Sequence, residues 1–206
     1  MEPELKASGF VVVGGRSSRM GRDKALLPLG GVPLALHIAG QLQQVVSDVT
    51  LLGTPSTYLH LGLPVLPDAQ AQRGPLAGLC AGLENSPTEW SVFVACDMPY
   101  VDSDIFMALL HCAATADAQA VVPHVDGLWQ PLCAAYHSSC LPVLQAALQG
   151  EERSVVRAFA RLRVHPVSAE ELGGAERCSL IFRNANTPDD WQLVRRDMGG
   201  LNAHIG

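Results

Sequence analysis

Residues 11–24 read Val-Val-Val-Gly-Gly-Arg-Ser-Ser-Arg-Met-Gly-Arg-Asp-Lys. An apolar run ends at two glycines, and four cations follow within nine residues, in a chain that holds only 14 Lys and Arg and has a formal net charge of -6. Glycine permits left-handed backbone and close approach to a ligand, so that successive N–H groups can point at phosphate oxygens. The stretch predicts a buried strand followed by an anion-binding loop. The alternative is a solvated basic loop, which has little need for two glycines at a strand end.

The composition is typical of an α/β protein. Hydrophobic residues make up 48% of the 206 residues and aromatic residues 5%, which describes an aliphatic core of parallel strands covered on both faces. The length fits one domain, 1–206, with a core at about residues 9–197. The pI of about 5.6 argues against nucleic acid as a partner. No apolar run reaches the roughly 18 residues of a membrane span. The first nine residues are polar and predict no secretory signal, so a cytoplasmic location is expected.

The cysteines and histidines form no recognisable metal motif. The six cysteines contain no C-x-x-C pair and are expected to be reduced and mostly buried, without disulfides or zinc. The seven histidines never adopt H-E-x-x-H spacing, and we expect surface or packing roles for them.

Apolar runs alternate with turn signals along the whole chain. Strands are expected at 10–13, 49–52, 65–66, 92–95, 120–122, 132–136 and 182–183. Helices are expected at 33–47, from Pro75, and at 102–115, 139–148, 154–162 and 188–196, the last one capped by Thr187. This order predicts a three-layer, Rossmann-like α/β fold with an open, mainly parallel sheet. Ligands bind such sheets at the carboxyl ends of the strands.

Asp97 directly follows an apolar run that ends at Cys96. A carboxylate at the end of a buried strand is costly unless it meets a cation. Mg²⁺ takes one or two carboxylates together with phosphates and waters, which favours a magnesium site at Asp97 opposite the cationic loop. The alternative role is a cap for the next helix, for which Asp102 is better placed.

Lys24 opens the apolar stretch 25–27, which predicts an anchored stem and an ammonium directed back at the loop. A compact point charge of this kind suits a polyphosphate. The alternative is a surface lysine paired with Asp23. The loop itself matches neither the Walker A spacing nor G-x-G-x-x-G, which disfavours a P-loop ATPase and an ordinary dinucleotide dehydrogenase.

Three further positions have both a functional and a structural interpretation. Asp68 ends a short apolar run, and it is either a ligand contact or a turn residue after Pro67. Gly74 precedes a helix start whose free N–H groups can take a base or a phosphate. Asn184 follows the strand expected at 182–183, and its carbonyl is either a metal ligand or part of the capping region before Thr187.

The segment 14–24 resembles the signature loop of the GT-A-like nucleotidyltransferases, and most closely that of the molybdenum cofactor guanylyltransferases. Gly-Pro-Leu-Ala-Gly-Leu at 74–79, Cys-Asp-Met-Pro at 96–99, Gln-Pro-Leu at 130–132 and Asn-Ala-Asn-Thr-Pro at 184–188 resemble later blocks of that family, in the same order. The similarity extends over about residues 10–191.

The resemblance implies a role for each matching position. Val12, Val13 and Gly14 would line the guanine and ribose, and Asp68 would contact the nucleoside. Gly15 and Gly74 would also border the nucleotide. Lys24 would hold the phosphates, and Asp97 would bind Mg²⁺ and the nucleotide. From the residues themselves, Arg19 is expected to stabilise the phosphates together with Lys24, and the Asn184 carbonyl to complete the metal site. Two departures stand out: Val12-Val13 replaces the family's Leu-Ala, and an asparagine of the family falls at Leu52-Gly53.

The implied reaction is Mg²⁺-dependent transfer of GMP from GTP to the phosphate of molybdenum-molybdopterin, with release of pyrophosphate. It implies GTP and molybdenum-molybdopterin as substrates, a molybdoenzyme or its chaperone as acceptor of the product, and a monomer or weak homo-oligomer. No nucleic acid or membrane partner is expected. Two alternatives remain: a related nucleotidyltransferase that uses CTP or another nucleoside triphosphate, and a catalytically silent nucleotide-binding protein.

Overall fold

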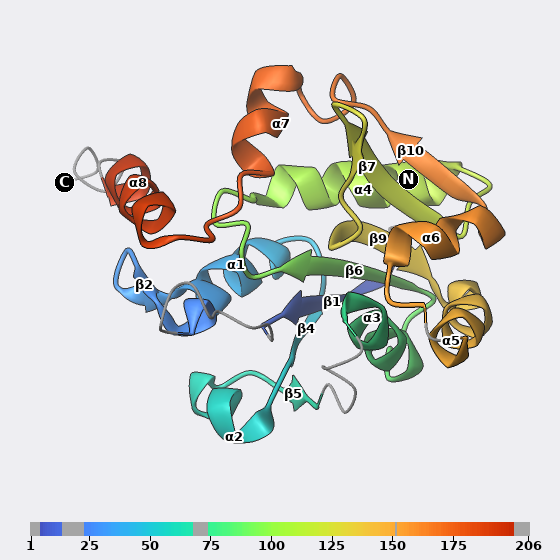
Figure 1. The fold of residues 1–206 in the computed structure, drawn as a ribbon, viewed down its shortest axis with the longest axis horizontal. Helices are drawn as coiled ribbons and strands as arrows, with labels where there is room; N and C mark the ends of the chain where they lie inside the picture. The colour runs from blue at the N-terminus through green and yellow to red at the C-terminus, as the bar shows by residue number, and fades with distance from the viewer. Residues whose placement is uncertain (1–4, 14–22, 68–73, 151, 200–206) are drawn as a thin grey trace.

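A mixed sheet forms the centre of the molecule (Figure 1). The computed structural model describes residues 5–13, 23–67, 74–150 and 152–199. The strand order in the sheet is β10-β7-β9-β6-β1-β4-β5, and the short strand β8 pairs with β7. The bounds are β1 Ala7–Val12, β4 Asp48–Leu52, β5 Val65–Leu66, β6 Trp90–Ala95, β7 Ala120–Val125, β8 Leu128–Trp129, β9 Cys133–His137 and β10 Val164–Val167. A separate hairpin pairs β2 Pro28–Leu29 with β3 Val32–Pro33.

The carboxyl ends of the three central strands lie side by side. β1 pairs in parallel with β4 and with β6, so that Val12 is in register with Leu52 on one side and with Ala95 on the other. The backbone continues the pairing beyond the strands, since Val13 N donates to Leu52 O at 3.0 Å and Cys96 N donates to Val12 O at 3.0 Å. Residues that follow β1 and β6 therefore start from neighbouring points on one edge. β9 runs antiparallel to both β6 and β7, which makes the sheet mainly rather than wholly parallel.

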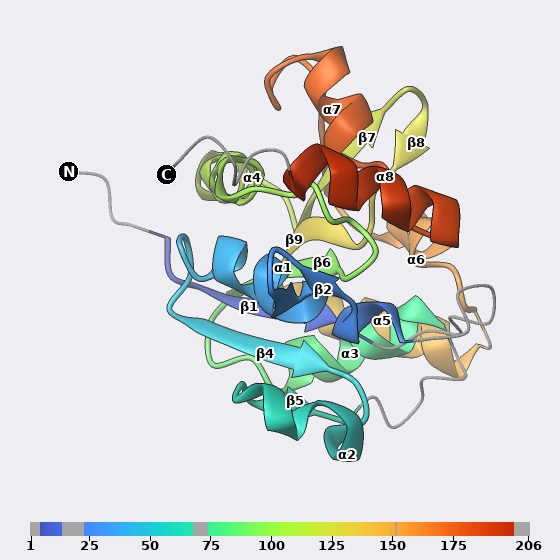
Figure 2. The ribbon, with the colours of Figure 1, turned by 90° about the vertical axis from the view of Figure 1, so that its left-hand side faces the viewer.

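Helices cover both faces of the sheet, as the two views in Figures 1 and 2 show. Alternate residues of each buried strand enter different cores: Val11 and Val94 face one, and Phe10 and Phe93 face the other. The first core is covered by α1 Leu34–Leu42, α4 Ser103–Thr115, α7 Ala175–Ile181 and α8 Pro188–Gly199. The second is covered by α3 Pro75–Glu84, α5 Leu141–Gln149 and α6 Val155–Ala158. The predicted three-layer α/β fold is confirmed.

Short elements complete the chain. Helix α2 spans Pro55–Tyr58, and the 3₁₀ turns are η1 Lys24–Leu26, η2 Leu59–Leu61, η4 Ser138–Cys140 and η5 Phe159–Arg161. Asp102 caps α4 as expected, because its Oδ1 accepts from Ile105 N at 3.1 Å.

One predicted strand is wrong. Phe182 and Arg183 were expected to be extended, but Phe182 ends helix α7, and its backbone N donates to Cys178 O at 3.0 Å. The physical reason is that Cys178 and Ile181, which lie three residues apart, are both buried, and this is the spacing of a buried helix face. The pair Phe182-Arg183, taken alone, does not reveal this pattern. Asn184 therefore follows a helix and not a strand. Two predicted helices are also shorter than expected, since α1 ends at Leu42 and residues 154–162 form α6 followed by η5.

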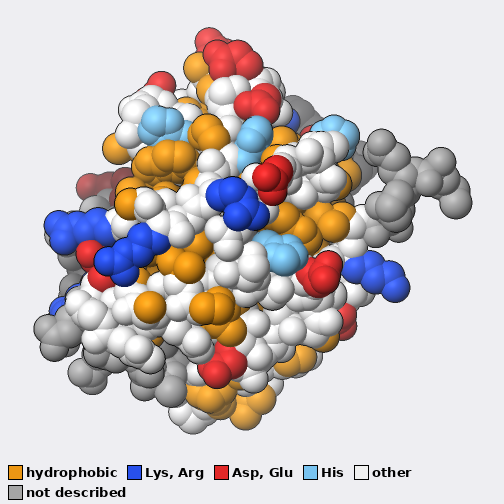
Figure 3. Space-filling model, turned by 90° about the vertical axis from the view of Figure 1, so that its right-hand side faces the viewer, with side chains coloured by type: hydrophobic (Ala, Val, Ile, Leu, Met, Phe, Trp, Pro, Cys, Tyr) orange, Lys and Arg blue, Asp and Glu red, His pale blue; other side chains and the backbone are white. Residues whose placement is uncertain are grey.

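No helix among the described residues is both long enough and apolar enough to cross a membrane. All six cysteines are free, and only Cys112 among them is not buried. On the face drawn in Figure 3, basic and acidic side chains form small groups among apolar and neutral atoms. The described residues on that face form no extended basic stripe of the kind that a phosphate backbone requires.

Candidate functional site

Four of the predicted site residues lie outside the described residues: Gly14, Gly15, Arg19 and Asp68. The other six, Val12, Val13, Lys24, Gly74, Asp97 and Asn184, have described positions. The site is therefore built from the strand ends and from the segments that flank the loop.

Asp97 lies at the carboxyl end of β6, where the turn begins with Met98 N donating to Ala95 O at 3.4 Å. Its side chain is half-buried. Burial raises the pKa of the Asp97 carboxyl above its ordinary value, and the nearby Lys24 ammonium partly opposes this rise. A hydrogen bond from the backbone N–H of Asp97 itself opposes the rise as well. It is thus a desolvated acceptor beside a cation.

Lys24 is the first residue of η1, and its ammonium contacts a residue that is distant in the sequence. Asp23 caps this turn, since its Oδ1 accepts from Ala25 N at 3.0 Å. Lys24 Nζ donates to Asn186 Oδ1 at 2.6 Å, although the two residues are 162 positions apart. Asp23 is occupied by the cap, so the alternative of a surface lysine paired with its neighbour does not apply. The segment at Ala185 and Asn186 brings Lys24 to the end of β6, because Asn186 accepts from Lys24 while Ala185 N donates to Asp97 O.

The segment between α7 and α8 is fastened to this rim. Ala185 N donates to Asp97 O at 2.9 Å, which seats the segment directly against the end of β6. The expected capping box is present: Thr187 N donates to Asp190 Oδ2 at 2.8 Å, and Asp190 N donates to Thr187 Oγ1 at 3.2 Å. The structure brings Asn184 next to Asp97 through the backbone and leaves its side chain exposed.

Asn186 is a residue of the site that sequence reasoning missed. Its amide, and not that of Asn184, contacts Lys24. Its own backbone N is held by Asp190 Oδ2 at 2.9 Å, which fixes the direction of the side chain. The sequence signal was the run Asn184-Ala185-Asn186, in which the side-chain amide of either asparagine could belong to the site. The strand wrongly expected at 182–183 drew attention to the first one.

Tyr58 is a second missed residue. Its ring is 4% exposed, and its hydroxyl lies 2.7 Å from Val13 O and 2.5 Å from Asp23 Oδ2. Burial and the Asp23 carboxylate raise the Tyr58 pKa far above its ordinary value, so the hydroxyl keeps its proton. The single hydroxyl therefore holds both flanks of residues 14–22. No sequence signal marked it, because its partners lie 45 and 35 positions away.

Val13 and Gly53 pack against each other where β1 and β4 end. A Cβ at Gly53 would lie 2.7 Å from Val13 Cγ2 and 2.8 Å from Tyr58 Cε2, too close for any real side chain. Val13 is 2% exposed, while Val12 is partly exposed. Val13 thus fills part of the space that a side chain at position 53 would need.

Gly74 precedes helix α3 with a φ of +83°, a left-handed conformation that favours glycine. A Cβ there would lie 3.5 Å from Arg153 O, so the start of α3 faces the segment that leads into α6. The first turn of α3 offers few free N–H groups, because Pro75 has none and Ala77 N donates to Gly74 O at 3.2 Å.

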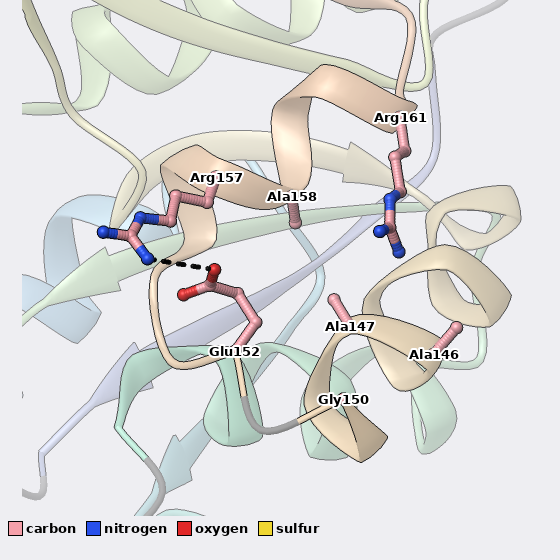
Figure 4. A pocket seen from close by; sticks show the side chains of 7 residues that line it. All are labelled: Ala146, Ala147, Gly150, Glu152, Arg157, Ala158 and Arg161. Atoms are coloured by element: carbon pink, nitrogen blue, oxygen red, sulfur yellow. Dashed lines mark ion pairs between the residues drawn. The ribbon is translucent and has the colours of Figure 1, made fainter.

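A pocket of about 180 Å³ lies between α5 and α6 and is separate from these residues (Figure 4). It is lined by Ala146, Ala147, Gly150, Glu152, Arg157, Ala158 and Arg161. Arg157 Nη1 pairs with Glu152 Oε2 at 3.6 Å, which neutralises half of its basic lining. None of the six described site residues lines it.

Known proteins resemble this chain over most of its length. The MobA-like NTP transferase domain matches residues 9–166. A probable molybdenum cofactor guanylyltransferase of Pelotomaculum thermopropionicum is 34% identical over 203 residues, which cover 98% of this chain and 97% of the relative. A protein of the same name from Nostoc sp. is 35% identical over 95% of this chain and 93% of its own length.

A solved structure has the same fold. The molybdopterin-guanine dinucleotide biosynthesis protein A of Archaeoglobus fulgidus superposes with a TM-score of 0.81 at 24% identity, covering 94% of this chain and 99% of that one. Together with the sequence relatives, this leads to one assignment. The chain belongs to the MobA-like NTP transferase family, is related over its whole length to the molybdenum cofactor guanylyltransferases, and is a nucleotidyltransferase.

Proposed function

We propose that this chain transfers GMP from GTP to the terminal phosphate of molybdenum-bound molybdopterin and releases pyrophosphate. The names of its relatives support the class of reaction. The observation that carries the proposal is the convergence of Lys24, Asn186 and Asp97 on the rim where β1 and β6 end. A cation and a desolvated carboxylate on one rim suit a triphosphate and the metal ion that accompanies it.

The residues fit a magnesium ion. The Asp97 carboxylate is desolvated, with its pKa raised by burial, so a divalent cation would compensate a cost that Lys24 only partly offsets. Asp97 would hold the ion, and Asn184, whose neighbour Ala185 donates to Asp97 O, would supply a further oxygen through its exposed amide. When bound, Mg²⁺ neutralises charge on the nucleotide phosphates.

The chemistry requires positioning rather than a strong general base. A phosphate monoester has a second pKa near 6, so the attacking oxygen is already largely deprotonated at pH 7. That oxygen forms a bond to the α-phosphorus of GTP, and the bond from this phosphorus to the pyrophosphate oxygen breaks. Two unit charges 4 Å apart interact by about 4 kcal/mol at an effective dielectric constant near 20. Lys24, fixed by Asn186, and Arg19 in the preceding loop would stabilise the departing charge.

The nucleoside would lie over the end of β1. In this proposal Val12, Val13 and Gly14 border guanine and ribose, Gly15 and Gly74 lie beside the nucleotide, and Asp68 contacts the nucleoside. The packing of Val13 against Gly53 shapes this wall, which would bear on the choice of base.

Pyrophosphate release tests the proposal directly. With molybdenum-loaded molybdopterin as acceptor, we expect turnover with GTP and Mg²⁺, and little with ATP, CTP or UTP. Faster turnover with CTP would replace GTP in the proposal. Absence of turnover with all four, despite nucleotide binding, would favour a silent nucleotide-binding protein.

The lysine content allows a sharper binding test. Lys6 and Lys24 are the only lysines of the chain, so reductive methylation with ¹³C-formaldehyde places labels on two side chains and the amino terminus. GTP with Mg²⁺ should move the Lys24 signal and leave that of the exposed Lys6 unchanged. The Lys24→Ala and Lys6→Ala variants assign the two signals. A GTP-induced shift confined to Lys6 would contradict the proposed site.

A further inference from the structure

Three potential metal ligands gather at a place remote from the nucleotide rim. One ligand atom each of Cys112, His165 and Glu171 lies within 4.8 Å of the other two. The residues come from three different elements: the last turn of α4, the edge strand β10, and the turn that follows β10. Such a set is invisible as a sequence motif, because Cys112 is separated from His165 by more than fifty residues.

The donors are of the kinds that select zinc. A thiolate, an imidazole and a carboxylate are a zinc-type set, and three protein ligands with a water in the fourth position make a tetrahedral site. With bond lengths near 2.0–2.3 Å, the ligand atoms of a bound ion are about 3.3–3.6 Å apart. The three ligand atoms lie within 4.8 Å of one another, so a side-chain shift of at most about 1.5 Å brings them to this spacing at a partly exposed site.

The surroundings already hold the carboxylate in place. Glu171 Oε2 accepts from Ser168 N at 2.8 Å, and Ser168 Oγ accepts in return from Glu171 N at 3.4 Å. In metal sites, a hydrogen bond from a neighbouring group to a ligating carboxylate orients that carboxylate toward the ion. The imidazole of His165 makes no hydrogen bond to another residue in the described ranges, and Cys112 is the one cysteine of the six that is not buried. Each donor is therefore accessible.

The position of the cluster gives the ion a mechanical role. β10 lies at the edge of the sheet and has β7 as its only strand partner among the described strands. Arg177 Nη2 already ties α7 to the start of α4, at 2.8 Å from each oxygen of Asp102. An ion at Cys112 and His165 would tie β10 to the other end of the same helix. The stretch from β10 to α7 leads directly to Asn184 and Asn186.

We propose that Cys112, His165 and Glu171 bind one zinc-class divalent ion, which fastens edge strand β10 to helix α4. This ion is distinct from the magnesium ion of the proposed reaction, and its site lies at the opposite end of the strands, because β10 runs parallel to β7 and His165 pairs with Val121 in the first half of that strand. The proposal does not depend on the nucleotide chemistry.

The test uses untagged, metal-stripped, full-length protein in excess Mg²⁺, which occupies sites made of oxygen ligands. Titration with Zn²⁺ against a chromophoric chelator should show one saturable site, and Co²⁺ should give a thiolate-to-cobalt charge-transfer band. The Cys112→Ser, His165→Asn and Glu171→Gln variants should each weaken Zn²⁺ binding at least tenfold, and Cys112→Ser should abolish the band. Circular dichroism confirms that each variant folds.

The chain offers a matched control for each ligand. Cys80→Ser removes a cysteine on the opposite face of the sheet, His111→Asn removes the histidine next to Cys112, and Glu170→Gln neutralises the carboxylate next to Glu171. These three should bind Zn²⁺ as the wild type does. The proposal is overturned if no saturable site is found, if Co²⁺ binds without the charge-transfer band, or if the controls lose as much affinity as the ligand variants.

Discussion

At the scale of single residues, the Tyr58 hydroxyl contacts both segments that flank residues 14–22. Tyr58 joins Val13 at the end of β1 to Asp23 at the start of η1, and Asp23 in turn caps the turn that carries Lys24. The two flanks of residues 14–22 are thereby held at a fixed separation. A change at Tyr58 would therefore displace Asp23 and, because Asp23 caps η1, would also displace Lys24.

Tyr58→Phe removes this bond while leaving the ring in place. A buried acceptor that loses its partner costs about 1–3 kcal/mol, so we expect a lower melting temperature and a raised KM for GTP. The matched control is Tyr136→Phe, because Tyr136 is also buried and donates to Pro131 O at 2.8 Å on the far side of β6. It should lower stability without raising KM. Equal KM values in the two variants would show that Tyr58 has no role in positioning.

The Asp97 carboxyl serves the proposed reaction but lowers the stability of the folded protein at neutral pH. Because burial raises its pKa in the folded protein, the folded state holds this proton more tightly than the unfolded chain does. The carboxyl therefore costs stability as the pH rises from its ordinary pKa through the raised one, and the cost is full above that point.

Asp97→Asn should separate the two effects. We expect turnover to fall by about 10³-fold or more, since preorganised charge at the reacting phosphate is lost. The melting temperature at pH 7 should stay equal or rise, with the difference from wild type vanishing in acid. Thermal unfolding of metal-free protein between pH 4 and 8 measures this. A variant that is both inactive and less stable at neutral pH would contradict the desolvation argument.

At the scale of elements, the ends of β1 and β4 are coupled through Val13 and Gly53. Gly53→Asn inserts a side chain where Val13 Cγ2 and the Tyr58 ring leave no room, and Val13→Ala removes the first of these two obstacles. Each single change should destabilise the protein, and the double variant should recover part of the loss. Coupling between residues in contact is typically about 0.5–3 kcal/mol, which a double-mutant cycle in urea resolves. Additive effects would mean that the two positions do not compensate each other.

The elements also show why sequence reasoning succeeded in one place and failed in another. The ends of β1 and β6 were predictable, because continuous apolar runs stop at polar residues and parallel strands align their carboxyl ends. The helical character of 175–182 was not, because only Cys178 and Ile181 are buried in a segment that is otherwise largely exposed. That error shifted the expected amide from Asn186 to Asn184.

At the scale of the whole molecule, contacts between distant segments were beyond sequence reasoning. Lys24 and Asp97 were predictable from their places after strands, but the partner of Lys24 depends on how the segment after α7 returns to the end of β6. Tyr58 and the set Cys112, His165 and Glu171 were invisible for the same reason. The sequence around each of these residues does not indicate which distant residues it contacts in the folded protein.

The bond between Lys24 and Asn186 also bears on the order in which the polypeptide is made. The lysine leaves the ribosome early, while its amide partner is polymerised 162 residues later. A nascent chain can build the central strands long before it can lock this ammonium in place. The pair therefore cannot form until residue 186 has been added, long after β1, β4 and β6 have been synthesised.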